Sequence, residues 1–261
     1  MKQPLSLRKE GAVARLRMER PEVHNAFDAA LVAALTHALS GLALDASVRV
    51  LVLEGEGASF SAGADLHWMR GMAAASELDN RQDALALAKL LRTIDELPKP
   101  TIARVHGAAF GGGVGLVAAC DIAIGVPGAK FGLTESKLGL LPAVISPYVV
   151  NAIGPRHARR YFASAEIFDA AQAQRMGLLH EVVEADALDD TVQRQVDLLL
   201  KAGPIAAASA KALVRNVASA SGPVAIDTAN AELIARLRVS PEGQEGINAF
   251  LEKRKPKWVP E

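Results

Sequence analysis

The chain has 261 residues, half of them apolar, which is enough to bury one large core, alone or with a small appended unit. Lys plus Arg and Asp plus Glu number 29 each, so no overall field attracts nucleic acid or an anionic membrane, and a small-molecule substrate is expected. A single cysteine, Cys120, excludes an intrachain disulfide, and the charged N-terminus lacks the apolar stretch of a signal peptide, so we expect a cytoplasmic protein.

The first part of the chain predicts strands mixed with helices. Alternating apolar residues on both sides of Glu10-Gly11 predict a hairpin with one buried face. Asp28 is a good N-cap for the amphipathic helix that should follow it. The β-rich run Val48–Leu53 predicts a strand, and a turn-rich loop is expected from Gly55 to Gly63.

The alternation of helices and strands continues to about residue 183. A short helix from Leu66 and a long amphipathic helix over 76–97 precede a strand over 101–105, which runs into the glycine-rich stretch 107–113. The later predicted elements are a buried helix over 114–120, strands over 121–126, 130–133 and 180–183, and helices over 142–153, 156–162 and 169–176.

The last part of the chain predicts helices only. The strand pattern stops near residue 187, and three or four helices follow, separated by Gly203-Pro204, Ser221-Gly222-Pro223 and Ser240-Pro241. We therefore expect two regions, a mixed core over 1–195 and a helical region over 196–261.

Two loops place glycine between a strand and the start of a helix. Such a loop lets backbone N–H groups approach a ligand, and the helix N-terminus adds positive potential. Gly111–Gly113 fits either an oxyanion site or a tight strand-to-helix turn, and the segment misses the G-x-G-x-x-G pattern because Leu116 stands at its sixth position. A second loop, Phe60–Leu66, has similar small residues, so one donor from each loop could converge on a single oxygen.

Several ordered blocks of the sequence resemble the crotonase, or enoyl-CoA hydratase/isomerase, family over nearly the whole chain. They are ERPEVHNAF at 19–27, FSAGADL at 60–66, HGAAFGGGVGL at 106–116, CDIAI at 120–124, AKFGLTESKLGLLP at 129–142, MGLLHEVV at 176–183 and FLEKRK at 250–255. The resemblance implies an α/β fold, a crotonase-type spiral of β-β-α turns with a C-terminal helical trimerisation region, and a homotrimer or a homohexamer.

The resemblance also implies positions for the binding site. The oxyanion hole falls on the N–H groups of Ala64 and Gly112, and the contacts to coenzyme A fall on Val23, Ala62, Ala64, Asp65, Leu66, Gly112 and, near the phosphates, Lys253 of the same or a neighbouring subunit. Asp65 has a second interpretation, as the N-cap of the next helix. We expect no metal and no separate cofactor, since coenzyme A is part of the substrate and the six histidines lack metal-ligand spacing.

Hydratases of this family commonly use two glutamates, and this sequence has only one of them. Glu135 matches the glutamate of the F-G-x-x-E block, whereas Gly115 stands where the other is expected. Leucines follow Glu135, so we expect its carboxyl to face a partly apolar pocket with a raised pKa and to act as an acid or base. Without the resemblance, an exposed residue or a helix cap would be the simpler interpretation.

The expected activity is hydration of an enoyl-CoA thioester through a stabilised enolate. The blocks SAGADLHWMR, GGGVGLVAACDIAI and LPAVISPYVV look most like methylglutaconyl-CoA hydratases of leucine degradation and the related carboxygeranoyl-CoA hydratases, which implies a branched or carboxylated acyl group. An enoyl-CoA isomerase with a single glutamate is the first alternative, because moving a double bond needs one base and no water. A non-catalytic scaffold that binds acyl-CoA is the second.

Overall fold

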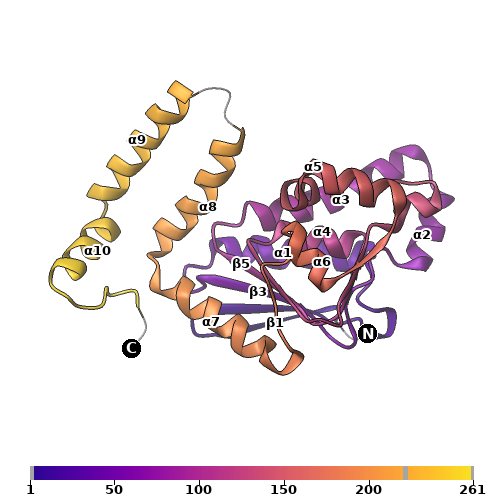
Figure 1. Cartoon of the computed structure of the whole chain (residues 1–261), viewed down its shortest axis with the longest axis horizontal. Helices are drawn as coiled ribbons and strands as arrows, with labels where there is room; N and C mark the ends of the chain where they lie inside the picture. Colours follow the sequence, from indigo (N-terminus) through magenta and orange to yellow (C-terminus); the bar gives the residue numbers. More distant parts are fainter. Residues whose placement is uncertain (1–2, 220–222, 260–261) are drawn as a thin grey trace.

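Two β-sheets form the centre of the molecule in the computed structural model, which describes residues 3–219 and 223–259 (Figure 1). The larger sheet has the strand order β1-β2-β3-β5-β7-β10, with only β1 antiparallel to its neighbour, and the smaller sheet has the order β4-β6-β8-β9. The strands are β1 (Leu5–Glu10), β2 (Val13–Met18), β3 (Val50–Gly55), β4 (Ser59–Ser61), β5 (Thr101–Val105), β6 (Ala108–Phe110), β7 (Ile122–Gly125), β8 (Lys130–Gly132), β9 (Ile167–Asp169) and β10 (Glu181–Val182).

The chain winds as a spiral of β-β-α turns. In each of three consecutive turns, the first strand joins the larger sheet, the second joins the smaller sheet, and a helix returns the chain to the start of the next turn. Parallel neighbours need such a crossover, so each sheet grows by one strand per turn. The helices of this part are α1 (Ala29–Leu44), α2 (Leu66–Ala73), α3 (Glu77–Asp95), α4 (Gly112–Ala119), α5 (Ser146–Ser164) and α6 (Ala170–Met176), with 3-10 turns η1 (Pro21–Val23) and η2 (Thr134–Leu138).

The longer predicted elements are confirmed. Asp28 caps α1, its side chain accepting a hydrogen bond from the Leu31 N–H at 2.8 Å, and the apolar face of α1 is buried against the sheet and α3. The two helices expected over 142–162 form one element, α5, which bends at Gly154, where φ is 74° and ψ is 158°.

Three short strands, β4, β6 and β9, were not predicted, whereas the equally short β8 and the shorter β10 were. Strand β4 lies inside the expected loop 55–63, β6 lies inside the glycine-rich stretch, and β9 follows α5 directly. Each has three residues, too few for the alternation of apolar residues to be recognised, and each pairs with strands of other turns of the spiral. These strands matter for function because β4 and β6 lead into the two glycine loops.

The C-terminal helices leave the body of the fold. Helix α7 (Leu188–Lys201) packs on the larger sheet, whereas α8 (Pro204–Ser219), α9 (Pro223–Val239) and α10 (Pro241–Leu251) extend to one side (Figure 1). Residue 195 lies within α7, and the predicted boundary there between a mixed core and a helical region remains a prediction. The predicted helix break at Ser221-Gly222 lies outside the described residues. Among the helices of 3–219 and 223–259, none combines the length and the apolar character needed to cross a bilayer.

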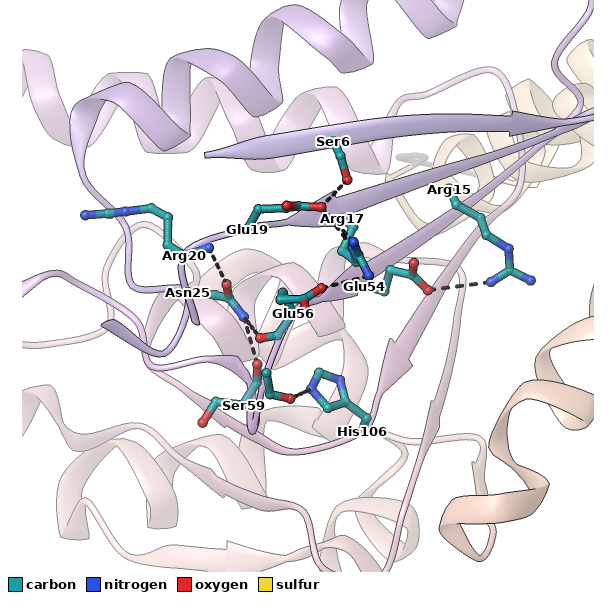
Figure 2. A network of polar contacts seen from close by, with 11 residues as sticks. Ser6, Arg15, Arg17, Glu19, Arg20, Asn25, Glu54, Glu56, Ser59 and His106 are labelled. Carbon is teal, nitrogen blue, oxygen red and sulfur yellow. Dashed lines mark hydrogen bonds and ion pairs between the residues drawn. The ribbon is translucent and has the colours of Figure 1, made fainter. Parts of the chain in front are cut away.

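A buried amide fastens β4 to the end of β3. Asn25 is fully buried: its Oδ1 accepts a hydrogen bond from the Arg20 N–H at 3.0 Å, and its Nδ2 donates to the carbonyl oxygens of Glu56 at 2.8 Å and Ser59 at 2.9 Å (Figure 2). The residue has φ of 54°, a left-handed conformation that asparagine tolerates better than most residues. The segment before α1 is thereby joined to the strand that carries the first glycine loop.

Replacing Asn25 by alanine should leave one N–H and two carbonyl groups without their partner. We expect the free energy of unfolding to fall by about 3 kcal/mol, since each orphaned buried group costs about 1–3 kcal/mol and relaxation recovers part of the loss. Urea unfolding at fixed protein concentration measures this change, with Asn151→Ala on the exposed side of α5 as the control. Equal stability of the two variants would contradict the anchoring role.

Candidate active site

Strands β4 and β6 bring the two glycine loops together. The strands are parallel neighbours, and both loops begin at the same edge of the smaller sheet. The backbones touch where the loops begin: a Cβ atom on Gly63 would lie 2.8 Å from the carbonyl oxygen of Phe110, and one on Gly113 would lie 2.5 Å from that of Ser61. Only glycine allows this approach, and Gly63 also has φ of 84°, which disfavours other residues.

Each loop carries a backbone N–H group without a partner. Among the described residues, no hydrogen bond is made by the N–H of Ala64 or of Gly112. Gly112 is the first residue of α4, where helical partners are missing, and Ala64 lies between Gly63 and Asp65, which pair with Phe27. Ala64 is exposed and Gly112 is partly exposed, so neither residue is closed off from solvent.

A buried carboxyl group lies beside the second loop. Glu135 belongs to η2, and its Oε1 lies 3.1 Å from the position that a Cβ atom would take on Gly111. Its Oε2 is buried and has no hydrogen-bond partner among the described residues. Burial raises the pKa of Glu135 above its usual range, as expected from the sequence. The interpretation of Glu135 as an exposed residue is therefore wrong, and burial favours the protonated form of its carboxyl group.

The place of a second carboxylate is filled by an apolar side chain. Gly115 lies one helical turn after Gly111 on the same face of α4. A Cβ atom on Gly115 would lie 2.9 Å from the Cβ of Ile145 and even closer to its Cγ2, and Ile145 is only 3% exposed. Because Ile145 packs against the Gly115 backbone, a glutamate there has no room without a change elsewhere.

Asp65 serves as a helix cap. Its Oδ1 accepts hydrogen bonds from the N–H groups of His67 at 2.8 Å and Trp68 at 3.2 Å, and its Oδ2 pairs with Arg20 at 3.1 Å. Burial alone would raise the pKa of Asp65, but the two N–H groups and the guanidinium outweigh it, so the pKa lies below its usual value. The N-cap interpretation is confirmed, and a contact with coenzyme A stays a prediction.

The other predicted binding residues divide into two groups. Val23 is the last residue of η1, and His24 follows it. The carbonyl oxygen of His24 accepts a hydrogen bond from the Ala62 N–H at 2.9 Å, so the end of η1 lies beside the first loop. Leu66 is 73% exposed at the start of α2. Lys253 follows α10, at the opposite end of the molecule from α2 (Figure 1), so a single chain does not bring it to the loops.

Two residues of the site were not singled out in the sequence. Phe27 and Ile145 contact glycines that lie far away in the chain, and neither belongs to a polar or charged pattern. In the resolved part of the chain, no group of three or more His, Cys, Asp or Glu side chains is arranged to hold a metal ion.

Comparison with known proteins places the whole chain in one group. The family model described as enoyl-CoA hydratase/isomerase matches residues 8–260. A crystal structure of an enoyl-CoA hydratase from Shewanella pealeana is 44% identical, covers 98% of this chain and 96% of its own, and superposes with a TM-score of 0.95. A structure from Legionella pneumophila, described provisionally as an enoyl-CoA hydratase/isomerase (crotonase), is 46% identical over 98% of this chain and 99% of its own, with a TM-score of 0.92. The 2,3-dehydroadipyl-CoA hydratase of Escherichia coli K12 is 31% identical over 97% of both chains.

The raised pKa of Glu135 gives the stability a pH dependence. Between the usual value of 4.5 and the raised native value, the native state holds a proton that the unfolded state releases. We therefore expect the stability of the wild type, relative to Glu135→Gln, to decline as the pH rises through this window and to level off above it. Denaturant unfolding of both proteins between pH 4 and pH 8 measures the difference, and a difference that does not vary with pH would argue against the burial of an ionisable group.

Proposed function

The chain belongs to the enoyl-CoA hydratase/isomerase family and has its crotonase fold, and on this basis we propose that it adds water across the α,β double bond of an acyl-CoA thioester. The observation that carries the proposal is the combination of two unpaired N–H groups, on Ala64 and Gly112, with one buried carboxyl group beside them, that of Glu135. A thioester that reacts through an enolate needs both kinds of group.

The two N–H groups would bind the thioester oxygen. Attack on the double bond moves negative charge onto this oxygen, and donors fixed in advance by the backbone lose nothing in reorientation. Each donor of this type contributes about 3 kcal/mol to the stabilisation of a transition state. Gly112 is also the first residue of α4, and the helix dipole adds positive potential at that end.

Glu135 would transfer the proton. As a carboxylate it accepts a proton from water while the water oxygen bonds to the β carbon and the double-bond electrons move onto the thioester oxygen. As a carboxylic acid it then returns a proton to the α carbon, and the carbonyl group is restored. Its raised pKa moves the exchange between the two forms toward neutral pH. The scheme uses no metal and no redox cofactor, so we propose that coenzyme A enters only as part of the substrate.

We propose a homotrimer, or a hexamer of two trimers, as the working form. Two observations support it. Helices α8 and α9 expose a groove of about 410 Å³ that is mostly apolar, and α10, which Lys253 follows, lies at the opposite end of the molecule from α2 (Figure 1). In an assembly, Lys253 of a neighbouring copy would reach the phosphates of coenzyme A, while Val23, Ala62 and the 64–66 segment hold the rest. The single cysteine fits a reducing compartment, and we place the activity in the cytoplasm.

A branched or carboxylated acyl group, such as that of 3-methylglutaconyl-CoA, is the substrate that we propose. The sequence blocks around the two loops support it, and an Escherichia coli relative is named for hydrating 2,3-dehydroadipyl-CoA, which is a dicarboxylic acyl thioester. Three leucines with exposed side chains, Leu138, Leu140 and Leu141, follow Glu135 and offer apolar surface to an acyl chain.

One observation favours a second candidate, enoyl-CoA isomerisation. Ile145 occupies the space beside Gly115, so the described site has one carboxyl group where hydratases of the family commonly use two. A single base suffices to move a proton between two carbon atoms. A non-catalytic scaffold is a weaker candidate, because a buried carboxyl oxygen without a partner, Oε2 of Glu135, costs stability that a purely structural protein need not lose.

Purified protein should hydrate an enoyl-CoA, and Glu135→Gln should lower kcat by about 10²–10⁴-fold, the usual contribution of a general acid or base. The assay offers crotonyl-, 3-enoyl-, 3-methylcrotonyl- and 3-methylglutaconyl-CoA and identifies products by mass, since hydration adds water and isomerisation does not. Full activity of Glu135→Gln would falsify the assignment. Migration of the double bond without a gain in mass would favour the isomerase, and binding without turnover would favour the scaffold.

A second carboxylate can be introduced only if Ile145 is reduced. We expect Gly115→Glu alone to destabilise the protein through its clash with Ile145, and Gly115→Glu combined with Ile145→Ala to fold and to hydrate crotonyl-CoA at least 10-fold faster than Ile145→Ala alone. Thermal unfolding monitors the clash, and initial rates monitor the gain. A folded double variant without faster hydration would show that the missing carboxylate does not limit the rate.

A further inference from the structure

Phe27 holds the first loop through its backbone. Its N–H donates to the carbonyl of Gly63 at 2.6 Å, and its carbonyl accepts from the N–H of Asp65 at 2.8 Å. These two hydrogen bonds flank Ala64 on both sides and form an isolated parallel bridge between Phe27 and Ala64. The pairing uses the groups next to Ala64 and leaves the Ala64 N–H free.

The side chain of the same residue supports the second loop. A Cβ atom on Gly112 would lie 2.5 Å from Cε2 and 2.9 Å from Cδ2 of the Phe27 ring, so the ring stands directly against the Gly112 backbone. Phe27 is only 2% exposed, and its ring is therefore fixed by packing. Gly112 does not have a left-handed φ, so steric contact alone requires glycine there.

Both neighbours of Phe27 are themselves anchored. The carbonyl of Ala26 accepts a hydrogen bond from Arg20 Nη1 at 2.6 Å, and Asp28 pairs with the same guanidinium at 2.9 Å while it caps α1. Arg20 also pairs with Asp65, which follows Ala64. The position of Phe27 is thus set from both sides by one cation that also binds the first loop.

We propose that Phe27 is a positioning residue that sets the spacing of the Ala64 and Gly112 N–H groups, its backbone fixing the first and its ring fixing the second. The inference rests on the proposed function, in which these donors share one thioester oxygen. Two donors can bind one oxygen well only if both lie within about 2.7–3.1 Å of it. A misplacement of about 1 Å can cost about 100-fold in rate.

The contact between the ring and Gly112 provides a direct test. Phe27→Ala and Gly112→Ala should each lower kcat on the best enoyl-CoA substrate by about 100-fold, with KM changed less than threefold, because both leave the N–H groups present but displaced. The double variant should be much less impaired than the 10⁴-fold product of the two, since the added methyl group occupies space that the ring has vacated. Losses that multiply to about 10⁴-fold would overturn the proposal.

A second measurement does not depend on activity. Hydrogen exchange followed by mass spectrometry should show faster exchange in segment 110–115 for Phe27→Ala, because the ring is lost, and a smaller change in segment 61–66, because alanine keeps the two backbone hydrogen bonds. The matched control Leu39→Ala, which truncates a fully buried residue farther along α1, should leave both segments unchanged. Unchanged exchange in segment 110–115 for Phe27→Ala would show that the ring does not hold the second loop and would refute the proposal. If the wild type turns over no enoyl-CoA but Phe27→Ala still shows the expected change in exchange, the proposed function is refuted and the structural role of Phe27 is not.

Discussion

The site depends on an approach of two backbones that leaves no room for a side chain between them. Gly63 contacts the carbonyl of Phe110, and Gly113 contacts the carbonyl of Ser61, so the segments that follow β4 and β6 run against each other. The spiral makes this contact possible because each turn adds one short strand to the smaller sheet beside the strand of the previous turn. Helices α2 and α4 then begin beyond the same end of the smaller sheet, with Ala64 just before α2 and Gly112 at the start of α4.

Three groups without a hydrogen-bond partner among the described residues lie at this edge, on Ala64, Gly112 and Glu135. Two backbone N–H donors and one buried carboxyl oxygen have no hydrogen bond among the described residues, although most of the nearby polar groups are paired. Asn25 and Asp65 satisfy the groups around them, and this support keeps the loops in place without using the free donors. The buried Glu135 oxygen costs stability while it is unpaired, and the two N–H groups beside it are open to a ligand, so a ligand that pairs with all three would account for the arrangement.

The sequence predicts the parts of the fold whose pattern is local. The long helices, the first hairpin, the N-cap at Asp28 and the two glycine loops follow from periodicity, capping and loop composition. Strands β4 and β6 do not, because three residues carry no period and their partners are dozens of residues away. Ile145 and Phe27 were missed for the same reason: each matters through a glycine in another element, and a missing side chain does not reveal which residue fills its space.

The contact between Ile145 and Gly115 bears on the chemistry as much as on packing. Glu135 meets the face of α4 at Gly111, and Ile145 meets the same face one turn later, so apolar surface replaces the group that would otherwise orient a water molecule. In such an environment the ionised form of Glu135 is disfavoured, which strengthens it as a base once it has lost its proton. A lone, strengthened base can remove a proton from carbon or from water, and the choice then depends on whether the bound acyl group leaves space for water between Glu135 and the β carbon. We therefore expect the shape of the acyl chain to decide between hydration and isomerisation.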